Sequence, residues 1–162
     1  MIAIKPIIYL DMDGVLADWE QQAYEFFGAE WRTELDKPQW GRFQDYPDYF
    51  LTLKPMEGAK ELYNACCEVA GCKSQVQLLT ALPNRVKFDD AARDKIMWAK
   101  RHIDQNIRVV FGPYAQDKQY HYRTNDILID DMALNIEQWP GFGIQHTSAE
   151  TSIAILLQQR SA

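Results

Sequence analysis

Two acidic pairs, each at the end of a short apolar run, are the residues of this chain best placed to do chemistry. Asp11 and Asp13 follow one run, and Asp130 and Asp131 follow another. Carboxylates brought within a few ångströms of one another repel strongly in a low-dielectric site unless a cation neutralises them. Because no histidine or cysteine stands beside either pair, these hard oxygen donors favour Mg²⁺ over a softer metal. The pattern predicts a magnesium site, provided that the fold brings the pairs together.

The residues after the first acidic pair exclude a calcium loop. Gly14 follows Asp13 directly and permits a sharp backbone turn. Calcium loops begin in a similar way, but in them further oxygen ligands follow at alternate positions, whereas Val15 and Leu16 follow here. Taken alone, the fragment could still be an acidic surface turn, and only the second acidic pair favours a functional site over that interpretation.

Apolar runs and helical patterns alternate along the chain, and this alternation sets the expected fold. Strand-like runs lie at 6–10, 76–80, 107–111, 127–129 and 143–146, and helical spacing is found at 57–70, at 89–104 and beyond a capping box at 147–150. The alternation predicts an α/β fold in which helices cover both faces of a parallel sheet. Ligands bind such sheets beyond the carboxyl ends of the strands, where Thr80 ends the second run and Lys118 follows the third.

The segment between the first two expected strands differs in composition from the rest. Residues 19–50 hold ten of the 20 aromatic residues of the chain. The segment is too long for a simple crossover and shows no strand pattern, so we expect a small helical cap inserted after the first strand. The predicted domains are an α/β core of residues 1–18 and 56–162 and an aromatic-rich cap of residues 19–55.

Six motifs, in the same order along the chain, resemble those of haloacid dehalogenase (HAD) superfamily phosphatases, and within these the 5′(3′)-deoxyribonucleotidase family. They are Asp11-Met12-Asp13-Gly14-Val15-Leu16-Ala17-Asp18, Pro55-Met56-Glu57-Gly58-Ala59, Leu78-Leu79-Thr80, Lys95-Ile96-Met97-Trp98, Asp117-Lys118 and Leu128-Ile129-Asp130-Asp131. The resemblance implies the Rossmann-like fold of the superfamily and the activity of a phosphoric monoester hydrolase.

The resemblance also implies a role for each acidic residue. Asp11 would be the nucleophile that forms an aspartyl-phosphate, and Asp13 would protonate the leaving sugar oxygen and then activate the hydrolytic water. Mg²⁺ would be bound by the carboxylates of Asp11 and Asp131 and by the backbone carbonyl of Asp13. Asp130 would support these ligands without binding the ion.

Three further residues would bind the phosphate by the same resemblance. The hydroxyl of Thr80 and the backbone N–H of Ala81 would hold phosphate oxygens, and Lys118 would neutralise the phosphoryl group. A strand-end threonine or a loop lysine is by itself no evidence of function. Only their combination with the acidic pairs indicates a functional role for these residues.

Two departures from the family pattern lie on the phosphate and sugar side of the expected site. Ala81-Leu82-Pro83 replaces a Ser-Pro sequence after the threonine, and Gln116 stands where an arginine precedes the loop lysine. These departures leave the sugar preference and the 5′ or 3′ selectivity open. Arg85 or Lys95 could compensate, although a basic residue on a helix is more often solvated.

The aromatic segment suggests the substrate. Trp19 lies just beyond the first motif, where the family places a base-contacting aromatic residue; Phe43 is the second choice and Trp40 a further one, while most of the other aromatic residues would form the core of the cap. Eight acidic and three basic residues between 18 and 50 would repel a polynucleotide backbone. We therefore expect a (deoxy)ribonucleoside monophosphate and no polymeric nucleic acid. The alternatives are another small phosphate ester or a nucleic-acid 3′ end, or a non-catalytic nucleotide-binding module.

Length and composition limit the remaining possibilities. The 162 residues correspond to about one domain with an insertion, and the net charge is −6. Apolar stretches are only strand-sized and the first ten residues lack a basic segment, so we expect neither a membrane segment nor a secretory signal. Cys66, Cys67 and Cys72 show no pairing pattern, which predicts reduced thiols and a cytoplasmic protein. A monomer or a homodimer is expected.

Overall fold

The computed structural model describes residues 6–31, 40–43, 45–83, 90–112 and 114–160. Its centre is a five-stranded parallel sheet in the order β3-β2-β1-β4-β5. The strands are β1 (Ile8–Leu10), β2 (Val76–Thr80), β3 (Arg108–Phe111), β4 (Ile127–Asp130) and β5 (Phe142–Gln145). The chain adds β2 and β3 on one side of β1, then β4 and β5 on the other. The order reverses between β1 and β4, and the two acidic pairs stand at the carboxyl ends of these strands, where such sheets bind ligands.

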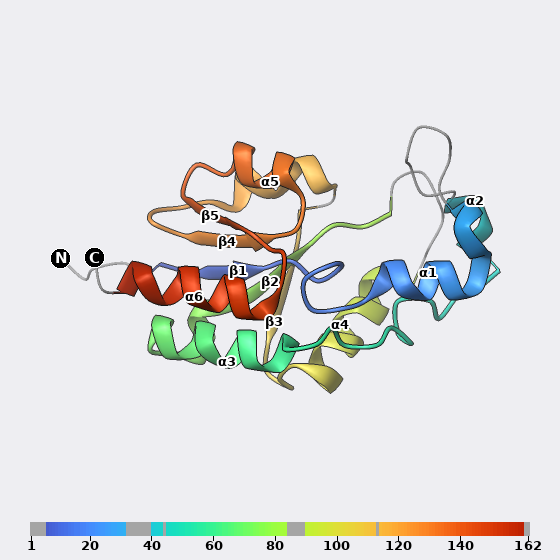
Figure 1. The fold of residues 1–162 in the computed structure, drawn as a ribbon, viewed down its shortest axis with the longest axis horizontal. Helices are drawn as coiled ribbons and strands as arrows, with labels where there is room; N and C mark the ends of the chain where they lie inside the picture. The colour runs from blue at the N-terminus through green and yellow to red at the C-terminus, as the bar shows by residue number, and fades with distance from the viewer. Residues whose placement is uncertain (1–5, 32–39, 44, 84–89, 113, 161–162) are drawn as a thin grey trace.

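Helices cover both faces of the sheet, as the sequence predicts (Figure 1). One face packs against α3 (Ala59–Ala70), α4 (Ala91–His102) and α6 (Ala149–Arg160), and the other against α5 (Ala133–Gln138) and the 3₁₀ helix η3 (Ala115–His121). Alternation along β1 divides the core: Ile8 and Leu10 join the larger cluster, and Ile7 and Tyr9 join the smaller one. The expected α/β fold of the Rossmann-like type is thus confirmed.

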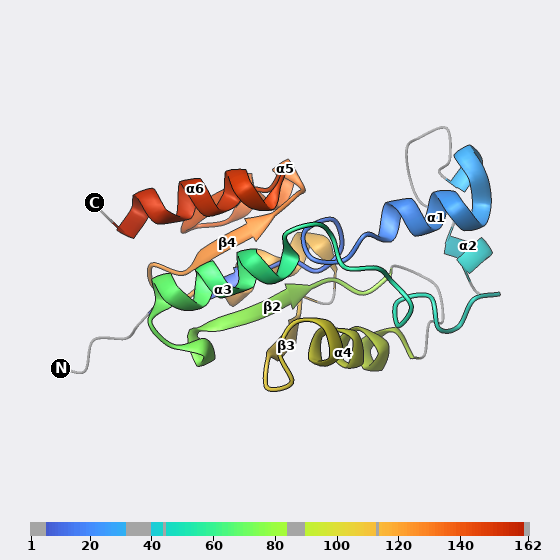
Figure 2. The same cartoon turned by 60° about the horizontal axis from the view of Figure 1, so that its bottom comes forward.

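The aromatic segment forms α1 (Trp19–Phe27), the 3₁₀ helix η1 (Gly28–Trp31) and the short helix α2 (Trp40–Phe43). These elements lie on the side toward which β2 and β4 point (Figure 2). Their rings pack together with centroids 4.6–6.4 Å apart; the members are Trp19, Phe26, Phe27, Phe43, Tyr46, Tyr49 and Phe50. Whether residues 19–55 form a separate domain stays a prediction.

The two chain connections between the sheet and the aromatic segment are hydrogen-bonded to each other. The Asp18 N–H donates to the Lys54 carbonyl at 2.9 Å, and the Met56 N–H donates to the Leu16 carbonyl at 2.8 Å. The Asp18 side chain also accepts from the Gln21 N–H and so caps α1. Paired in this way, the connections hold the start of α1 beside the end of β1.

Element boundaries differ from the expected ones at a few residues. The helix expected over 57–70 begins only at Ala59, because Gly58 takes a left-handed backbone with φ +73°. Ser148, rather than Thr147, caps α6: its hydroxyl accepts from the Thr151 N–H at 3.1 Å. Helix α5 was not expected from the sequence. Within the described residues no helix has the length and apolarity needed to cross a bilayer, and the three cysteines are free thiols.

Candidate active site

Asp11 stands directly after β1, and its backbone continues the sheet before the chain turns away. Its N–H donates to the Ile129 carbonyl of β4 at 2.9 Å, and its side chain is only 6% exposed. The following turn is closed by the Met12 carbonyl, which accepts from the N–H groups of Leu16 and Ala17 at 2.9 Å each. Gly14 adopts φ +83° in this turn. The turn therefore presents the Asp11 and Asp13 side chains at one edge of the sheet.

The second acidic pair lies close to the first. One carboxylate oxygen from each of Asp11, Asp130 and Asp131 lies within 4.8 Å of the others. Asp131 packs so closely on Gly14 that a Cβ at position 14 would lie 2.7 Å from the Asp131 Cγ. The topology thus brings together carboxylates that are more than a hundred positions apart in the sequence.

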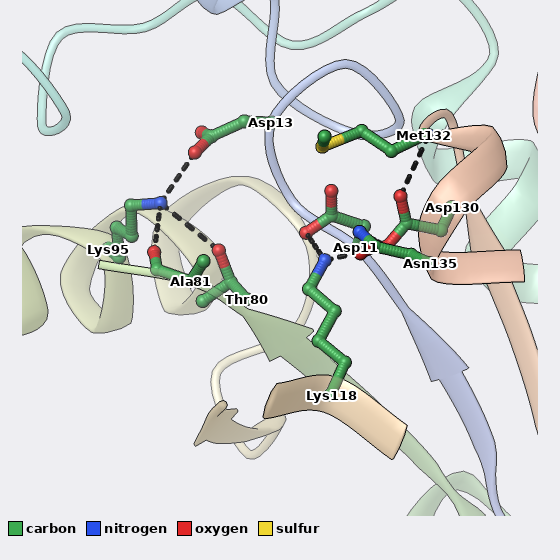
Figure 3. A network of polar contacts seen from close by, with 9 residues as sticks. All are labelled: Asp11, Asp13, Thr80, Ala81, Lys95, Lys118, Asp130, Met132 and Asn135. Atoms are coloured by element: carbon green, nitrogen blue, oxygen red, sulfur yellow. Dashed lines mark hydrogen bonds and ion pairs between the residues drawn. The ribbon is translucent and has the colours of Figure 1, made fainter. Parts of the chain in front are cut away.

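Asp130 is fully buried, and protein donors occupy its carboxylate. One oxygen accepts from the Met132 N–H at 2.9 Å; the other accepts from the Asn135 amide at 3.0 Å and from Lys118 Nζ at 2.6 Å (Figure 3). These bonds fix the end of β4 to the start of α5. This hydrogen bonding is expected of a carboxylate that supports Asp11 and Asp131 without itself binding a metal ion.

Lys118 is buried between the two acidic pairs rather than solvated, being only 2% exposed. Its Nζ lies 2.8 Å from an Asp11 oxygen and 2.6 Å from an Asp130 oxygen. Burial lowers the pKa of this ammonium, but the two carboxylates outweigh that effect and raise it overall. Lys118 therefore stays protonated and supplies a fixed positive charge to the site.

Even with Lys118 in place, the carboxylates are under-neutralised. Burial raises the pKa of Asp11 to about 8; Lys118 opposes this shift, and the neighbouring carboxylates add to it. Burial, again with a neighbouring carboxylate, raises the pKa of Asp131 to about 6. Additional positive charge beside Asp11 would lower the pKa of its carboxyl and favour the ionised form.

Lys95 is the main correction to the sequence analysis, which favoured a solvated residue on a helix. It is only 1% exposed, and its Nζ contacts the Asp13 carboxylate at 2.5 Å, the Thr80 hydroxyl at 3.1 Å and the Ala81 carbonyl at 2.8 Å (Figure 3). The Phe50 ring centroid lies 4.6 Å from the same Nζ. Arg85, the other residue considered as a compensating base, lies outside the described residues.

The residues at this edge of the sheet fit a hard divalent cation. In the described part of the chain, the ammonium groups of Lys95 and Lys118 face the carboxylates of Asp11, Asp13, Asp130 and Asp131, and these six groups together carry a formal charge of −2 when all are ionised. All nearby ligand atoms are oxygens, the ligands of hard cations. Asp13 Oδ1 is also buried without a hydrogen-bond partner among the described residues. Asp13 is not in the carboxylate triad, as expected if only its backbone carbonyl is a ligand.

The remaining predicted site residues lie near this edge or above it. The Thr80 hydroxyl is buried, and the Ala81 carbonyl, rather than its N–H, has a described contact. Trp19 begins α1, is half-buried, and packs against Phe43 at 6.4 Å between ring centroids. Phe43 is 0% exposed and belongs to the aromatic core, so a base could reach it only if that core opened. The side chain of Trp40 lies outside the described residues.

Comparison with known proteins agrees with this geometry. The family described as 5′ nucleotidase, deoxy (pyrimidine), cytosolic type C matches residues 5–155. A protein of Vibrio phage KVP40 assigned as a 5′(3′)-deoxyribonucleotidase is 30% identical over 136 residues, which cover 81% of this chain and 69% of the phage protein. The chain therefore belongs to the cytosolic type C deoxy-5′-nucleotidase family of the HAD superfamily and is a phosphoric monoester hydrolase of the nucleoside monophosphate phosphatase type.

Proposed function

We propose that this enzyme hydrolyses (deoxy)ribonucleoside monophosphates, with a preference for pyrimidines, in a Mg²⁺-dependent reaction through an aspartyl-phosphate. The observation that carries the proposal is the placement of Asp11 beside Lys118, with an Asp131 oxygen within 4.8 Å of an Asp11 oxygen. The family description and the name of the phage relative support the nucleotide substrate.

In the proposed mechanism the chain supplies the nucleophile, the acid and the charge. An Asp11 oxygen attacks phosphorus, the bond to the sugar oxygen breaks, and Asp13 gives that oxygen a proton. Asp13 then takes a proton from a water whose oxygen bonds to phosphorus while the Asp11–phosphorus bond breaks. Lys118 and the Thr80 hydroxyl stabilise the charge on the phosphoryl oxygens.

The carboxylates of Asp11 and Asp131 and the backbone carbonyl of Asp13 would hold the Mg²⁺, and Asp130 would brace them. When bound, the ion would neutralise the carboxylates and bind a phosphate oxygen. Additional positive charge beside Asp11 lowers the pKa of its carboxyl, which favours the ionised nucleophile. The under-neutralised carboxylates support this assignment.

The surroundings of the site favour a mononucleotide over a nucleic-acid end. Trp19 stands at the start of α1, just beyond the turn that carries Asp13, so a base stacked on its ring would gain ~1–3 kcal/mol. The excess of acidic residues between 18 and 50 opposes a polynucleotide backbone. The free cysteines support a reducing compartment, and we propose a cytoplasmic location.

The test is phosphate release from purified protein across the common ribo- and deoxyribonucleoside monophosphates, with Mg²⁺ or with EDTA. We expect Mg²⁺-dependent release that is fastest for pyrimidine nucleotides. Release from sugar phosphates or from 3′-phosphorylated oligonucleotides alone would refute the nucleotide assignment. Full activity in EDTA would refute the metal dependence.

A further inference from the structure

The ammonium of Lys95 is fully committed to protein acceptors. Its three contacts, to Asp13 Oδ2, the Thr80 hydroxyl oxygen and the Ala81 carbonyl, equal the number of hydrogens that an ammonium carries. No hydrogen is left for a substrate phosphate. Any effect of Lys95 on the reaction must therefore pass through the groups it holds.

At Asp13 this arrangement distinguishes the two carboxylate oxygens. Oδ2 faces the Lys95 ammonium, whereas Oδ1 is buried and has no hydrogen-bond partner among the described residues. Lys95 therefore fixes the rotation of the Asp13 carboxylate through its contact with Oδ2.

At Thr80 the same ammonium sets the direction of the hydroxyl. A hydroxyl has one hydrogen and two acceptor lone pairs, and Lys95 occupies a lone pair at 3.1 Å. The hydroxyl hydrogen must point away from Lys95. Lys95 thereby keeps Thr80 available as a donor rather than as an acceptor.

We propose that Lys95 is a positioning residue that fixes the orientation of the Asp13 carboxyl for proton transfer and holds the Thr80 hydroxyl as a phosphate donor. This inference rests on the proposed function. As the Asp11 oxygen bonds to phosphorus and the bond to the sugar oxygen breaks, the proton of the Asp13 carboxyl moves to that sugar oxygen. Lys95 touches neither the phosphorus nor the leaving oxygen.

Stability alone is a weak reason for a lysine at this position. Taking an ammonium out of water is costly, and well-packed apolar residues in place of a whole buried ion pair often serve the fold as well or better. The Phe50 ring and the three acceptors offset that cost. Through these contacts the positive charge of Lys95 acts on the Asp13 carboxylate and on the Thr80 hydroxyl.

The test compares two substrates that differ in their need for a proton at the leaving oxygen. The sugar oxygen of a nucleotide leaves poorly without protonation, whereas the phenolate of p-nitrophenyl phosphate leaves readily. For Lys95→Met we expect kcat on the nucleotide to fall about 10²–10³-fold, the range of general acid catalysis. With p-nitrophenyl phosphate kcat should fall less than tenfold. Lys100→Met, an exposed lysine on the same helix, is the matched control and should leave both rates unchanged.

A thermodynamic cycle and a folding measurement separate positioning from structural damage. Asp13→Asn combined with Lys95→Met should lose little more nucleotide activity than Asp13→Asn alone, because both changes disable one unit. Lys95→Met leaves Asp13 without its charged partner and should melt at a lower temperature, so both rates are measured well below the unfolding transition of the variant; if this variant does not fold, Lys95→Gln carries the same test.

Three results would overturn the inference: equal losses of Lys95→Met on both substrates, no loss on either, or multiplicative losses in the double variant. If the wild type still hydrolyses nucleotides in that experiment, the proposed function stands. A wild type that releases phosphate from neither substrate would overturn both.

Discussion

Gly14 is the position in the first acidic turn where a side chain would collide with a predicted metal ligand, and Gly14→Ala tests that close contact. Glycine here has φ +83°, and an added Cβ would lie 2.7 Å from the Asp131 Cγ and 3.2 Å from its Oδ1. Cβ atoms essentially never lie under 3.0 Å from another heavy atom, so the Asp131 carboxylate must move away from position 14. We expect weaker Mg²⁺ binding as well as lower stability.

The loss of stability and the loss of Mg²⁺ affinity in Gly14→Ala have different expected sizes, and a control variant separates them. The left-handed backbone costs an alanine roughly 1–2 kcal/mol, which lowers the melting temperature by about 2–8 °C for a chain of this size. Gly71 has φ +71° with no atom within 4 Å of its added Cβ, so Gly71→Ala carries the backbone cost without the collision. Displacing a metal-binding carboxylate or its support typically lowers metal affinity about 10–100-fold.

The assay is a Mg²⁺ titration of both variants, followed by nucleotide hydrolysis and, independently, by the rise in melting temperature that the ion produces. Gly71→Ala should match the wild type in half-saturating Mg²⁺, and Gly14→Ala should need about 10–100-fold more. If the two variants lose similar stability and bind Mg²⁺ equally well, Asp131 is not held in place by Gly14. Its assignment as a ligand would then lose its geometric basis.

Three other expectations follow from the same site. Asp11→Asn should abolish turnover yet melt at a higher temperature than the wild type at pH 8 without metal, because it removes a buried like charge; near-wild-type activity would refute covalent catalysis. Metal-free wild type should lose stability as the pH rises from about 4 to 8, because the raised pKa values of Asp11 and Asp131 make the folded state bind more protons than the unfolded state in that range. Calorimetry should show Mg²⁺ stabilising most at the upper end, and a Mg²⁺ effect independent of pH would contradict this account. Trp19→Ala should raise KM for nucleotides about tenfold or more, with little change for p-nitrophenyl phosphate, whereas Tyr24→Ala should change neither.

The position of the site could be predicted from the sequence because it depends on strand ends. Asp11, Thr80 and Asp130 each end an apolar run, and parallel strands place their carboxyl ends at the same edge of the sheet. No knowledge of strand order was needed for that step. The order itself, with β1 between β2 and β4, puts the two acidic pairs side by side.

The burial of Lys95 was missed because the apolar spacing over 89–104 indicates a different stripe of α4. That spacing runs through Ala92, Ile96, Ala99 and Ile103, of which Ala99 and Ile103 are buried, whereas the buried face of the helix is the set Ala91, Asp94, Lys95, Trp98 and Ala99. The latter set also has 3–4 spacing and includes the bulky Trp98. Two charged residues on this face obscured it, since hydrophobic periodicity gives a buried functional charge no weight.

Phe43 shows a different limit. An aromatic side chain that lines a substrate pocket and one that fills a small core have the same composition and spacing in the sequence. Only the packing decides, and here Phe43 meets Phe27 at 4.6 Å and Tyr49 at 4.9 Å between ring centroids. Trp19 stays the better candidate because it is half-buried at the start of α1, next to the turn that carries Asp13.

The two buried lysines divide the neutralisation of the site in a way that leaves a place for one divalent cation. Lys118 contacts Asp11 and Asp130, and Lys95 contacts Asp13, so the two ammonium groups are held by different carboxylates. Neither has a described contact with Asp131, whose pKa is raised by burial and by a neighbouring carboxylate. The unneutralised charge therefore lies between Asp11 and Asp131. A further fixed lysine there would be an alternative to a metal ion, but it would occupy the position that a phosphate oxygen needs, whereas a hydrated ion can exchange a water for that oxygen.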